Sequence, residues 1–313
     1  KILIADCSPP SISCPAPQTL TCHSDYNASL PPNPMTEAEF EALAGGGSVS
    51  DNCSIDRVEY SDVVSDWNCT NKYKVTRTYV AYDQSGNSKS CTQMITVSDN
   101  VKPTFTTLPS DLTLACPNPN LPPVAYGIQI LGIVGNIQAW LNNFGGATVS
   151  DNCGGPFTQN VVICFLFNPL TGCQTSSPAT GPGVWAEMPE ACSPQPREVQ
   201  VAFYVKDECG NESFAVAKVI LVDNAAPTIP PLPALGLDTC FTQVPPPNPV
   251  IVPASDNCTE NANLTKEHVS DVPLSVTGCP GDQTIIRTYR VTDCAGNSAT
   301  RTQTITVNDN VAP

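Results

Sequence analysis

The sequence has few charged residues, and most of its charge is of one sign. Only 14 lysines and arginines stand against 29 aspartates and glutamates, so the formal net charge at pH 7 is -15. Phosphate groups and anionic lipid headgroups are repelled by such a surface, whereas cations are attracted. This balance argues against nucleic acid or an anionic membrane surface as a partner.

Groups that carry catalysis are also scarce. The two histidines, His23 and His268, have no nucleophile or metal motif beside them. We find no Ser/His/Asp set, no catalytic metal cluster and no phosphate-binding loop. No ladder of Cys-x-x-Cys pairs indicates zinc. We therefore expect that the chain is not an enzyme.

Long apolar runs are the third absence. We find no run that approaches the roughly 20 residues of a membrane span, so we expect no membrane insertion in this stretch. The segment Lys1–Ala5 is too short for a signal peptide. Any export or anchoring signal is expected to lie outside these residues.

Cysteine and proline are abundant instead. Sixteen cysteines in an acidic, helix-poor chain indicate an oxidising compartment, and we expect an extracellular location at a cell surface. The 32 prolines and 19 glycines interrupt many short runs rich in valine, isoleucine, threonine and tyrosine. This pattern is typical of an all-β protein with many turns.

A repeated closing segment divides the chain. An alternating apolar strand is followed by Asp-Asn-x-x-Pro at Asp99, Asp223 and Asp309, and residues 1–10 match the same segment without gaps. The spacing from Asp6 through these aspartates gives repeats of 93, 124 and 86 residues, each the size of a β-sandwich. We expect the closing strand and linker of a preceding repeat at 1–10, then repeat one at 11–102, repeat two at 103–227 and repeat three at 228–313.

Each repeat follows one plan. A Ser-Asp-Asn-Cys turn precedes a long alternating strand, which ends in an Asp-x-x-Gly-Asn turn before the closing strand. Repeat one adds a short helix over 36–43, where Thr36 and Glu39 fit a capping box. Repeat two adds a helix over 133–144 and a lobe from Cys164 to Cys192, while no helix is expected in repeat three. Period-two alternation predicts a buried face on the long strands, with Arg77 and Arg287 at its rim.

Together these motifs resemble the hyalin-like, immunoglobulin-like repeats of large Bacteroidetes surface proteins, including gliding-motility adhesins. The resemblance spans the whole chain and implies three tandem immunoglobulin-like β-sandwich repeats with short helical insertions and disulfide bonds. It implies a non-catalytic extracellular rod or filament of a cell-surface adhesin. The expected partners are further repeats of the same chain, and surface glycans or proteins.

In such a sandwich the two turns share one end of each repeat, called the top here, and the closing strand ends at the bottom. Cysteines at opposite ends of a strand lie too far apart to bond. We therefore expect each cysteine to pair with one at the same end of its own repeat. The expected pairs are Cys7–Cys53, Cys14–Cys91, Cys22–Cys69, Cys116–Cys192, Cys153–Cys209, Cys164–Cys173, Cys240–Cys279 and Cys258–Cys294. Pairing of sequence neighbours, such as Cys22 with Cys53, is the alternative.

The acidic turns converge where a repeat follows a junction. Calcium takes six to eight oxygen ligands, and these turns supply carboxylates, amides and carbonyls. The candidate calcium ligands are Asp6, Asp51, Asp83, Asn87, Asp99, Asn100, Asp151, Asp207, Asn211, Asp223, Asn224, Asp256, Asp293 and Asn297. Aspartate and asparagine are also good turn residues without any metal, and this alternative stays open.

With catalysis excluded, two alternative functions remain. The first is a structural and adhesive spacer. The second is a glycan- or protein-binding module that uses the Cys164–Cys192 lobe of repeat two. Deleting that lobe before a binding assay would separate them.

Overall fold

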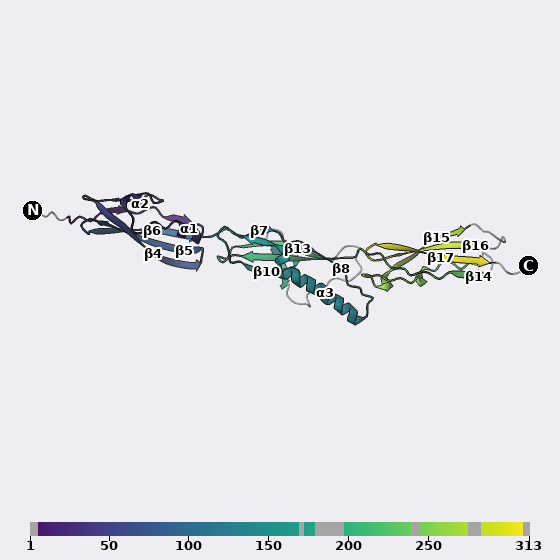
Figure 1. The fold of residues 1–313 in the computed structure, drawn as a ribbon. Coiled ribbons are helices and arrows are strands. Elements are labelled where there is room, and N and C mark those ends of the chain that lie inside the picture. The colour runs from purple at the N-terminus through teal and green to yellow at the C-terminus, as the bar shows by residue number, and fades with distance from the viewer. Residues whose placement is uncertain (1–5, 169–171, 179–196, 239–243, 275–282, 309–313) are drawn as a thin grey trace, which may run out of the picture. The chain divides into compact units, whose positions relative to one another are not determined.

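The computed structural model of the chain describes residues 6–168, 172–178, 197–238, 244–274 and 283–308 (Figure 1). Strands dominate these ranges and form three sheets of four or five strands and two sheets of two. The expected all-β class, with tandem sandwich repeats, disulfide bonds and helical insertions, is confirmed. The strand expected at 1–5 lies outside the described residues.

Repeat one pairs a four-stranded sheet with a two-stranded one. The larger sheet has the order β2-β6-β5-β4, and β1 pairs with β3 in the smaller. The strands are β1 (Ser11–Ser13), β2 (Gln18–Leu20), β3 (Ser48–Ser50), β4 (Ile55–Cys69), β5 (Lys72–Asp83) and β6 (Ser88–Ser98). Their core contains Phe40, Val49, Val58 and Tyr79, all nearly inaccessible to solvent. Each such side chain contributes about 1.5–3 kcal/mol through burial.

Repeats two and three reuse this arrangement. Their main sheets have the orders β11-β10-β12-β13-β8 and β14-β17-β16-β15, and β7 pairs with β9. In repeat two the strands are β7 (Thr104–Thr107), β8 (Leu112–Ala115), β9 (Thr148–Ser150), β10 (Thr158–Asn168), β11 (Gly172–Pro178), β12 (Arg197–Lys206) and β13 (Glu212–Val222). In repeat three they are β14 (Leu235–Asp238), β15 (Thr265–Leu274), β16 (Gln283–Thr292) and β17 (Ser298–Asn308).

One parallel pair recurs in every main sheet. The short strands β2, β8 and β14 run parallel to the closing strands β6, β13 and β17. Leu20 lies opposite Val97 and Leu114 lies opposite Leu221, so the two registers are the same. The residues that follow the short strand therefore reach the bottom of the repeat beside the junction aspartate.

The predicted alternation of the long strands is confirmed. In β5 every second residue from Tyr73 to Asp83 is buried, and Val75, Tyr79 and Ala81 are 0 to 1% exposed. Its predicted hairpin with β6 is present, with Tyr79 opposite Cys91. The connecting Asp-x-x-Gly-Asn turn needs glycine, because Gly86 has a φ of 87° in the left-handed region. Gly210 and Gly296 repeat this conformation with φ values of 96° and 94°.

The helices agree with the sequence in part. Thr36 is the N-cap of helix α2 (Glu37–Glu41), and Thr36 and Glu39 form the predicted capping box. Helix α1 (His23–Ala28) was not expected, although Asp25 caps it by accepting a hydrogen bond from the Cys22 amide at 2.9 Å. In the described part of repeat three, helical structure is limited to the 3-10 turns η3 (Pro249–Ile251) and η4 (Asn261–Asn263).

Helix α3 (Pro123–Asn142) starts ten residues before its predicted start at 133. Proline suits the first helical position because its missing N–H has no partner there, which explains the start. The helix ends before the 3-10 turn η1 (Phe144–Gly146). Ile137 and Leu141 are buried, whereas Val124 is 77% exposed and Leu131 is 68% exposed.

The prediction that no apolar run approaches the length of a membrane span is wrong for α3. Its 20 residues carry no charge, and the helix is long and apolar enough to cross a membrane, by length and composition alone. Glycine, glutamine and asparagine residues interrupt the apolar residues of this segment, so the sequence does not show one continuous apolar run. In the structure its last turns pack in repeat two, where Trp140 Nε1 donates to the Ser110 carbonyl at 3.0 Å.

Arg77 and Arg287 are buried, not at the rim of the core as predicted. They are 3% and 4% exposed. Each guanidinium binds a carboxylate on the neighbouring strand through two nitrogens, Arg77 to Asp62 at 2.6 and 2.8 Å and Arg287 to Asp271 at 2.8 and 2.9 Å. Repeat two has the apolar Val201 in the corresponding position, fully buried. The prediction that these arginines are not ligand-binding residues fits this structural pairing.

The chain divides into two compact units. The first comprises Lys1–Leu108, Ala147–Asn160 and Phe203–Ala215, and the second Pro109–Gly146, Val161–Ala202 and Val216–Pro313. The top of repeat two thus belongs to one unit with repeat one, and the junction of repeats two and three lies inside the other. The repeat boundaries predicted at 102/103 and 227/228 remain a proposal.

Candidate junction sites

The first junction joins the bottom of repeat one to the top of repeat two. Repeat one contributes Cys22, which follows β2, the turn Cys69 to Asn71 between β4 and β5, and Asp99, which follows β6. The amide of Asp99 donates to the Asn71 carbonyl at 2.9 Å, so these segments are held together. Repeat two contributes the turns that begin at Asp151 and Asp207.

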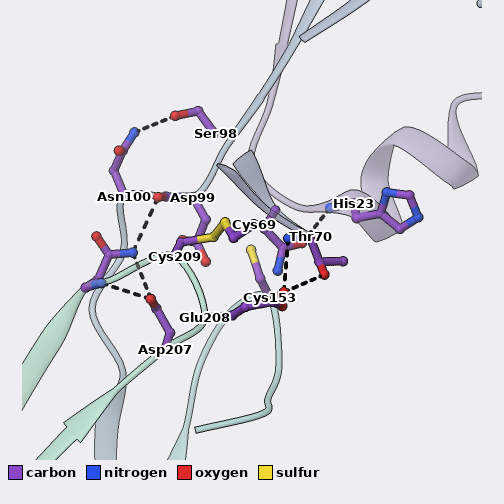
Figure 2. Close-up of a disulfide and its surroundings, with 12 residues drawn as sticks. His23, Cys69, Thr70, Ser98, Asp99, Asn100, Cys153, Asp207, Glu208 and Cys209 are labelled. Carbon is purple, nitrogen blue, oxygen red and sulfur yellow. Dashed lines mark hydrogen bonds between the residues drawn. A yellow bond between two sulfur atoms is a disulfide. The ribbon is translucent and has the colours of Figure 1, made fainter. Parts of the chain in front are cut away.

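Two disulfide bonds cross this junction. Cys22 bonds to Cys153 and Cys69 bonds to Cys209, with Cα atoms 5.2 and 5.3 Å apart. Figure 2 shows the second bond beside Thr70, whose hydroxyl donates to Glu208 at 2.9 Å. The amide of Asn211 adds a bond to the Asp99 carbonyl at 3.4 Å. Repeats one and two are therefore joined covalently at two points besides the chain itself.

The second junction has the same kind of bond. Cys116 follows β8 as Cys22 follows β2, and it bonds to Cys258 in the Asp-Asn-Cys turn of repeat three, with Cα atoms 5.6 Å apart. Asn120 strengthens this contact. Its amide nitrogen donates to the carbonyls of Asp256 and Thr259 at 2.9 and 2.8 Å, and its oxygen accepts from the Asn261 amide at 2.9 Å.

Most of the expected pairings are wrong, because the bonds cross between repeats instead of closing within them. The pairs overturned are Cys22–Cys69, Cys153–Cys209, Cys116–Cys192 and Cys258–Cys294, together with the alternative Cys22–Cys53. Cys294 also forms a disulfide bond. Cys7 and Cys53 are both free and exposed, so the pair Cys7–Cys53 is wrong too. The physical reason is that the bottom of one repeat abuts the top of the next.

One expected bond is present. Cys14 and Cys91 join the first and last strands of repeat one, with Cα atoms 5.7 Å apart. For Cys164–Cys173, the hairpin of β10 and β11 places Cys173 opposite Phe167, three residues from Cys164. The pair Cys164–Cys173 stays a prediction. Cys192, Cys240 and Cys279 lie outside the described residues.

Carboxylates gather at the same junctions. Ligand oxygens of Asp223, Asp256 and Asp293 all lie within 4.8 Å of one another, and Asp99 and Asp151 approach as closely beside Cys153. Asp6 and Asp51 form a third such group with Cys53 at the top of repeat one. The structure thus brings together the aspartates predicted from each junction and from each Asp-Asn-Cys turn.

One oxygen of each turn carboxylate has a structural role. Asp151 accepts from the Cys153 amide at 2.9 Å, and Asp256 accepts from the Cys258 and Thr259 amides at 2.8 Å. These are the hydrogen bonds that make aspartate a good turn residue. Turn formation without a metal therefore explains one of the two oxygens of each of these carboxylates.

The other oxygen has no partner. The second oxygens of Asp151 and Asp256 are buried and accept no hydrogen bond. The same is true of one oxygen of Asp51 and one oxygen of Asp223. Asp256 as a whole is only 5% exposed. A buried carboxylate oxygen without a donor costs free energy unless a cation or a water binds it. These oxygens fit a hard cation such as calcium.

The pKa values show the same uncompensated charge. Burial raises the pKa of Asp99 above its ordinary value, and the nearby carboxylates of Asp151 and Asp207 raise it further. Burial likewise raises the pKa of Asp223, with Asp256 and Asp293 adding to the effect. A divalent cation at these groups would offset the repulsion that adds to both pKa shifts.

The Asp-x-x-Gly-Asn turn uses its polar groups largely on itself. Asp207 accepts from the backbone and side-chain nitrogens of Asn211 at 2.9 and 2.7 Å. Asp83 with Asn87 and Asp293 with Asn297 make the same bonds. The asparagine side-chain nitrogens also donate to the junction carbonyls, so the structure presents these nitrogens as hydrogen-bond donors.

Several predicted ligands are not brought into the clusters, and Asp83 and Asp207 belong to none of these carboxylate groups. Asn100 is exposed, and its side chain donates to Ser98 at 3.0 Å (Figure 2). Asn224 is exposed as well. Residues that the sequence did not indicate are Thr70, Glu208 and Asn120, which bond across the junctions. No motif marks them, but their neighbouring cysteines Cys69, Cys209 and Cys116 were a usable signal.

No protein-family model matches the sequence, and no curated protein matches it. Solved cadherin structures align with most of its length. These include protocadherin gamma B2 extracellular cadherin domains 3–6, at 15% identity and a TM-score of 0.31, covering 99% of this chain and 79% of that one. Drosophila N-cadherin EC1-4 aligns at 11% identity and a TM-score of 0.30, covering 96% of this chain and 76% of that one. Mouse cadherin-23 EC22-24 aligns at 10% identity and a TM-score of 0.27, covering 96% of this chain and 99% of that one. Likeness at this level carries no conclusion about function, and the resemblance to hyalin-like repeats stays a prediction.

Proposed function

We propose that the chain is a non-catalytic extracellular spacer in which disulfide bonds fasten consecutive repeats to one another. The observation that carries this proposal is the set of bonds Cys22–Cys153, Cys69–Cys209 and Cys116–Cys258 across the junctions. Such bonds persist in oxidising compartments, which supports export. The finer assignment to a rod or filament of a cell-surface adhesin rests on the sequence resemblance.

Fastening at the junction has a mechanical consequence. A pulling force applied through the chain cannot extend the loop between Cys22 and Cys153, because the bond carries the force past it. This loop spans 131 residues, which correspond to about 450 Å of extended chain. A spacer built in this way lengthens less under load, when a repeat unfolds, than a chain without these bonds.

Single-molecule stretching of the intact chain tests this function. We expect a short maximum extension under oxidising conditions and a gain of several hundred ångströms on the addition of a thiol reductant. A chain in which Cys14 and Cys91 alone are replaced by serine controls for bonds within a repeat, and it should keep the short extension. Equal extension of the wild-type chain with and without reductant would contradict the proposal.

We propose that calcium binds at the junctions through the aspartates, chiefly Asp99 with Asp151 and Asp223 with Asp256 and Asp293. The unpartnered buried oxygens of Asp151 and Asp256 support this assignment. Calcium would supply positive charge where burial and mutual repulsion raise the pKa of Asp99 and Asp223. Backbone carbonyls and waters complete the coordination number that calcium requires.

The variant Asp256→Asn separates calcium binding from turn formation. Asparagine keeps an oxygen for the Cys258 and Thr259 amides and removes the uncompensated charge. We expect one calcium fewer per chain in a calorimetric titration, and a melting temperature in chelator no lower than that of the wild type. Calcium at 100 times its dissociation constant should stabilise the wild type by about 2.7 kcal/mol.

Glu41→Gln is the matched control, since it removes one negative charge from an exposed position on α2. Its calcium stoichiometry should equal that of the wild type. A wild-type chain that gives no heat with calcium and melts at the same temperature with chelator would show that the acidic turns are turns only.

A binding role for the lobe of repeat two is the second candidate. Hairpin β10-β11 widens the sheet of this repeat to five strands, whereas the main sheets of repeats one and three have four. The additional strand enlarges the surface that a glycan or protein could contact. Binding to a glycan array that is lost when residues 169–196 are deleted, with Cys14–Cys91 still formed, would support this role.

A further inference from the structure

The top of repeat one carries the same groups as the tops of repeats two and three. Asp51 accepts from the Cys53 amide at 2.8 Å, as Asp151 accepts from Cys153. Asn87 donates to the Asp6 carbonyl at 3.1 Å, as Asn211 donates to the carbonyl of Asp99. This end is therefore built like the receiving side of a junction.

The cysteine at this end differs in one respect. Cys153 and Cys258 are each bonded to a cysteine that follows the short parallel strand of the preceding repeat. These cysteines are Cys22, two residues after β2, and Cys116, directly after β8. Cys53 occupies the same position in its own turn, yet it is free and exposed. One oxygen of Asp51 beside it is buried without a partner, as is one oxygen of Asp151.

We propose that Cys53 forms a disulfide bond to the bottom of another repeat of this kind. The partner is a cysteine that follows the short parallel strand of that repeat, in the position that Cys22 and Cys116 hold here. The repeat either precedes in the same polypeptide or belongs to a second copy of the chain. This inference rests on the proposed fastening between repeats and extends it to a surface that this chain leaves open.

Of the two bridges at the first junction, only one has its top cysteine at this end. Repeat one has Ser85 where repeat two has Cys209, so the second bond seen at the first junction, Cys69–Cys209, has no counterpart. Cys7 is not that counterpart. It occupies the position of Asn100 and Asn224, neither of which is a cysteine, and Cys7 is free in the structure.

The bond forms by thiol–disulfide exchange. The Cys53 thiol and the partner thiol together lose two protons and two electrons, and a disulfide of a protein oxidoreductase accepts them and becomes two thiols. One sulfur of that oxidoreductase leaves as a thiolate when a first substrate thiolate attacks. The second substrate thiolate then displaces the remaining sulfur and closes the bond between the repeats.

Disulfide mapping of the full-length protein from the cells that make it tests this proposal. Free thiols are alkylated first, and the protein is digested without reduction. We expect the peptide that contains Cys53 joined to a strand-end cysteine of another repeat. Recovery of Cys53 in alkylated form, or joined to Cys7, would overturn the inference.

Two variants and a mass comparison complete the test. Cys53→Ser should abolish the joined peptide, whereas Cys7→Ser should leave it at the wild-type amount. Electrophoresis without reductant separates the two sources, since a bond to a second copy doubles the mass and a bond within one polypeptide does not. The same digest reports Cys22–Cys153, so failure at Cys53 with that bond intact overturns this inference alone.

Discussion

Replacement of Cys22, Cys69, Cys153 and Cys209 by serine is expected to destabilise the first junction by about 4 kcal/mol or more. The two bonds close loops of 131 and 140 residues, and loops of this size restrict the unfolded chain strongly. The hydrogen bonds from Thr70 to Glu208 and from Asn211 to Asp99 would then hold the junction without covalent support. Scanning calorimetry of the full chain should show a lower melting temperature for the transition that includes repeat one.

The pair Cys14–Cys91 provides the matched control. It joins two strands of one repeat with a separation of 77 residues, so its loss should weaken repeat one and leave the junction closed. The four-serine variant should gain reductant-independent extension in the stretching experiment, and the variant lacking only Cys14 and Cys91 should not. Wild-type behaviour of the four-serine variant in both measurements would contradict the proposed role of the junction bonds.

Asp62→Ala is expected to be among the most damaging single substitutions in repeat one, at about 3–5 kcal/mol. It leaves the guanidinium of Arg77 buried at 3% exposure without its carboxylate, and the side chain of Asp62 is itself only 15% exposed. Asp62 also accepts a hydrogen bond from the hydroxyl of Tyr26. Chemical denaturation of the variant should show the loss as a lower unfolding midpoint.

Two further substitutions distinguish the buried charge from a general loss of charge. Asp66→Ala breaks the exposed pair with Lys74, whose side chains are 64% and 49% exposed. It should cost about 1–2 kcal/mol, chiefly because Asp66 has a φ of 52° in the left-handed region that alanine disfavours. The double variant Asp62→Ala with Arg77→Val copies the apolar Val201 of repeat two and should recover much of the lost stability. An Asp62→Ala variant as stable as Asp66→Ala would show that the buried pair contributes little.

Much of the fold follows from local sequence patterns. Alternation in β5 predicts its buried face, because strand geometry places every second side chain in the core. The Asp-x-x-Gly-Asn turn predicts the hairpin, because Gly86 must adopt a positive φ. The capping box at Thr36 predicts α2 for a similarly local reason.

The features that the sequence did not predict depend on contacts between distant segments. Arg77 is on a strand whose pattern suggests a rim position, and only its pairing with Asp62 on β4 makes burial favourable. The disulfide pairs were sought within repeats, although the sequence already placed Asp99 against the turns that contain Cys153 and Cys209. Those turns bring the top cysteines next to Cys22, which the parallel register of β2 and β6 places at the level of Asp99. They also lie next to Cys69, in the turn whose Asn71 carbonyl accepts from the Asp99 amide.

Disulfide mapping of the native protein tests the central claim most directly. After alkylation of free thiols and digestion without reduction, mass spectrometry should find Cys22 joined to Cys153, Cys69 joined to Cys209 and Cys116 joined to Cys258. Cys14 should be joined to Cys91 in the same digest. Finding Cys22 joined to Cys69, and Cys153 joined to Cys209, would show that the repeats are closed individually and would contradict the account.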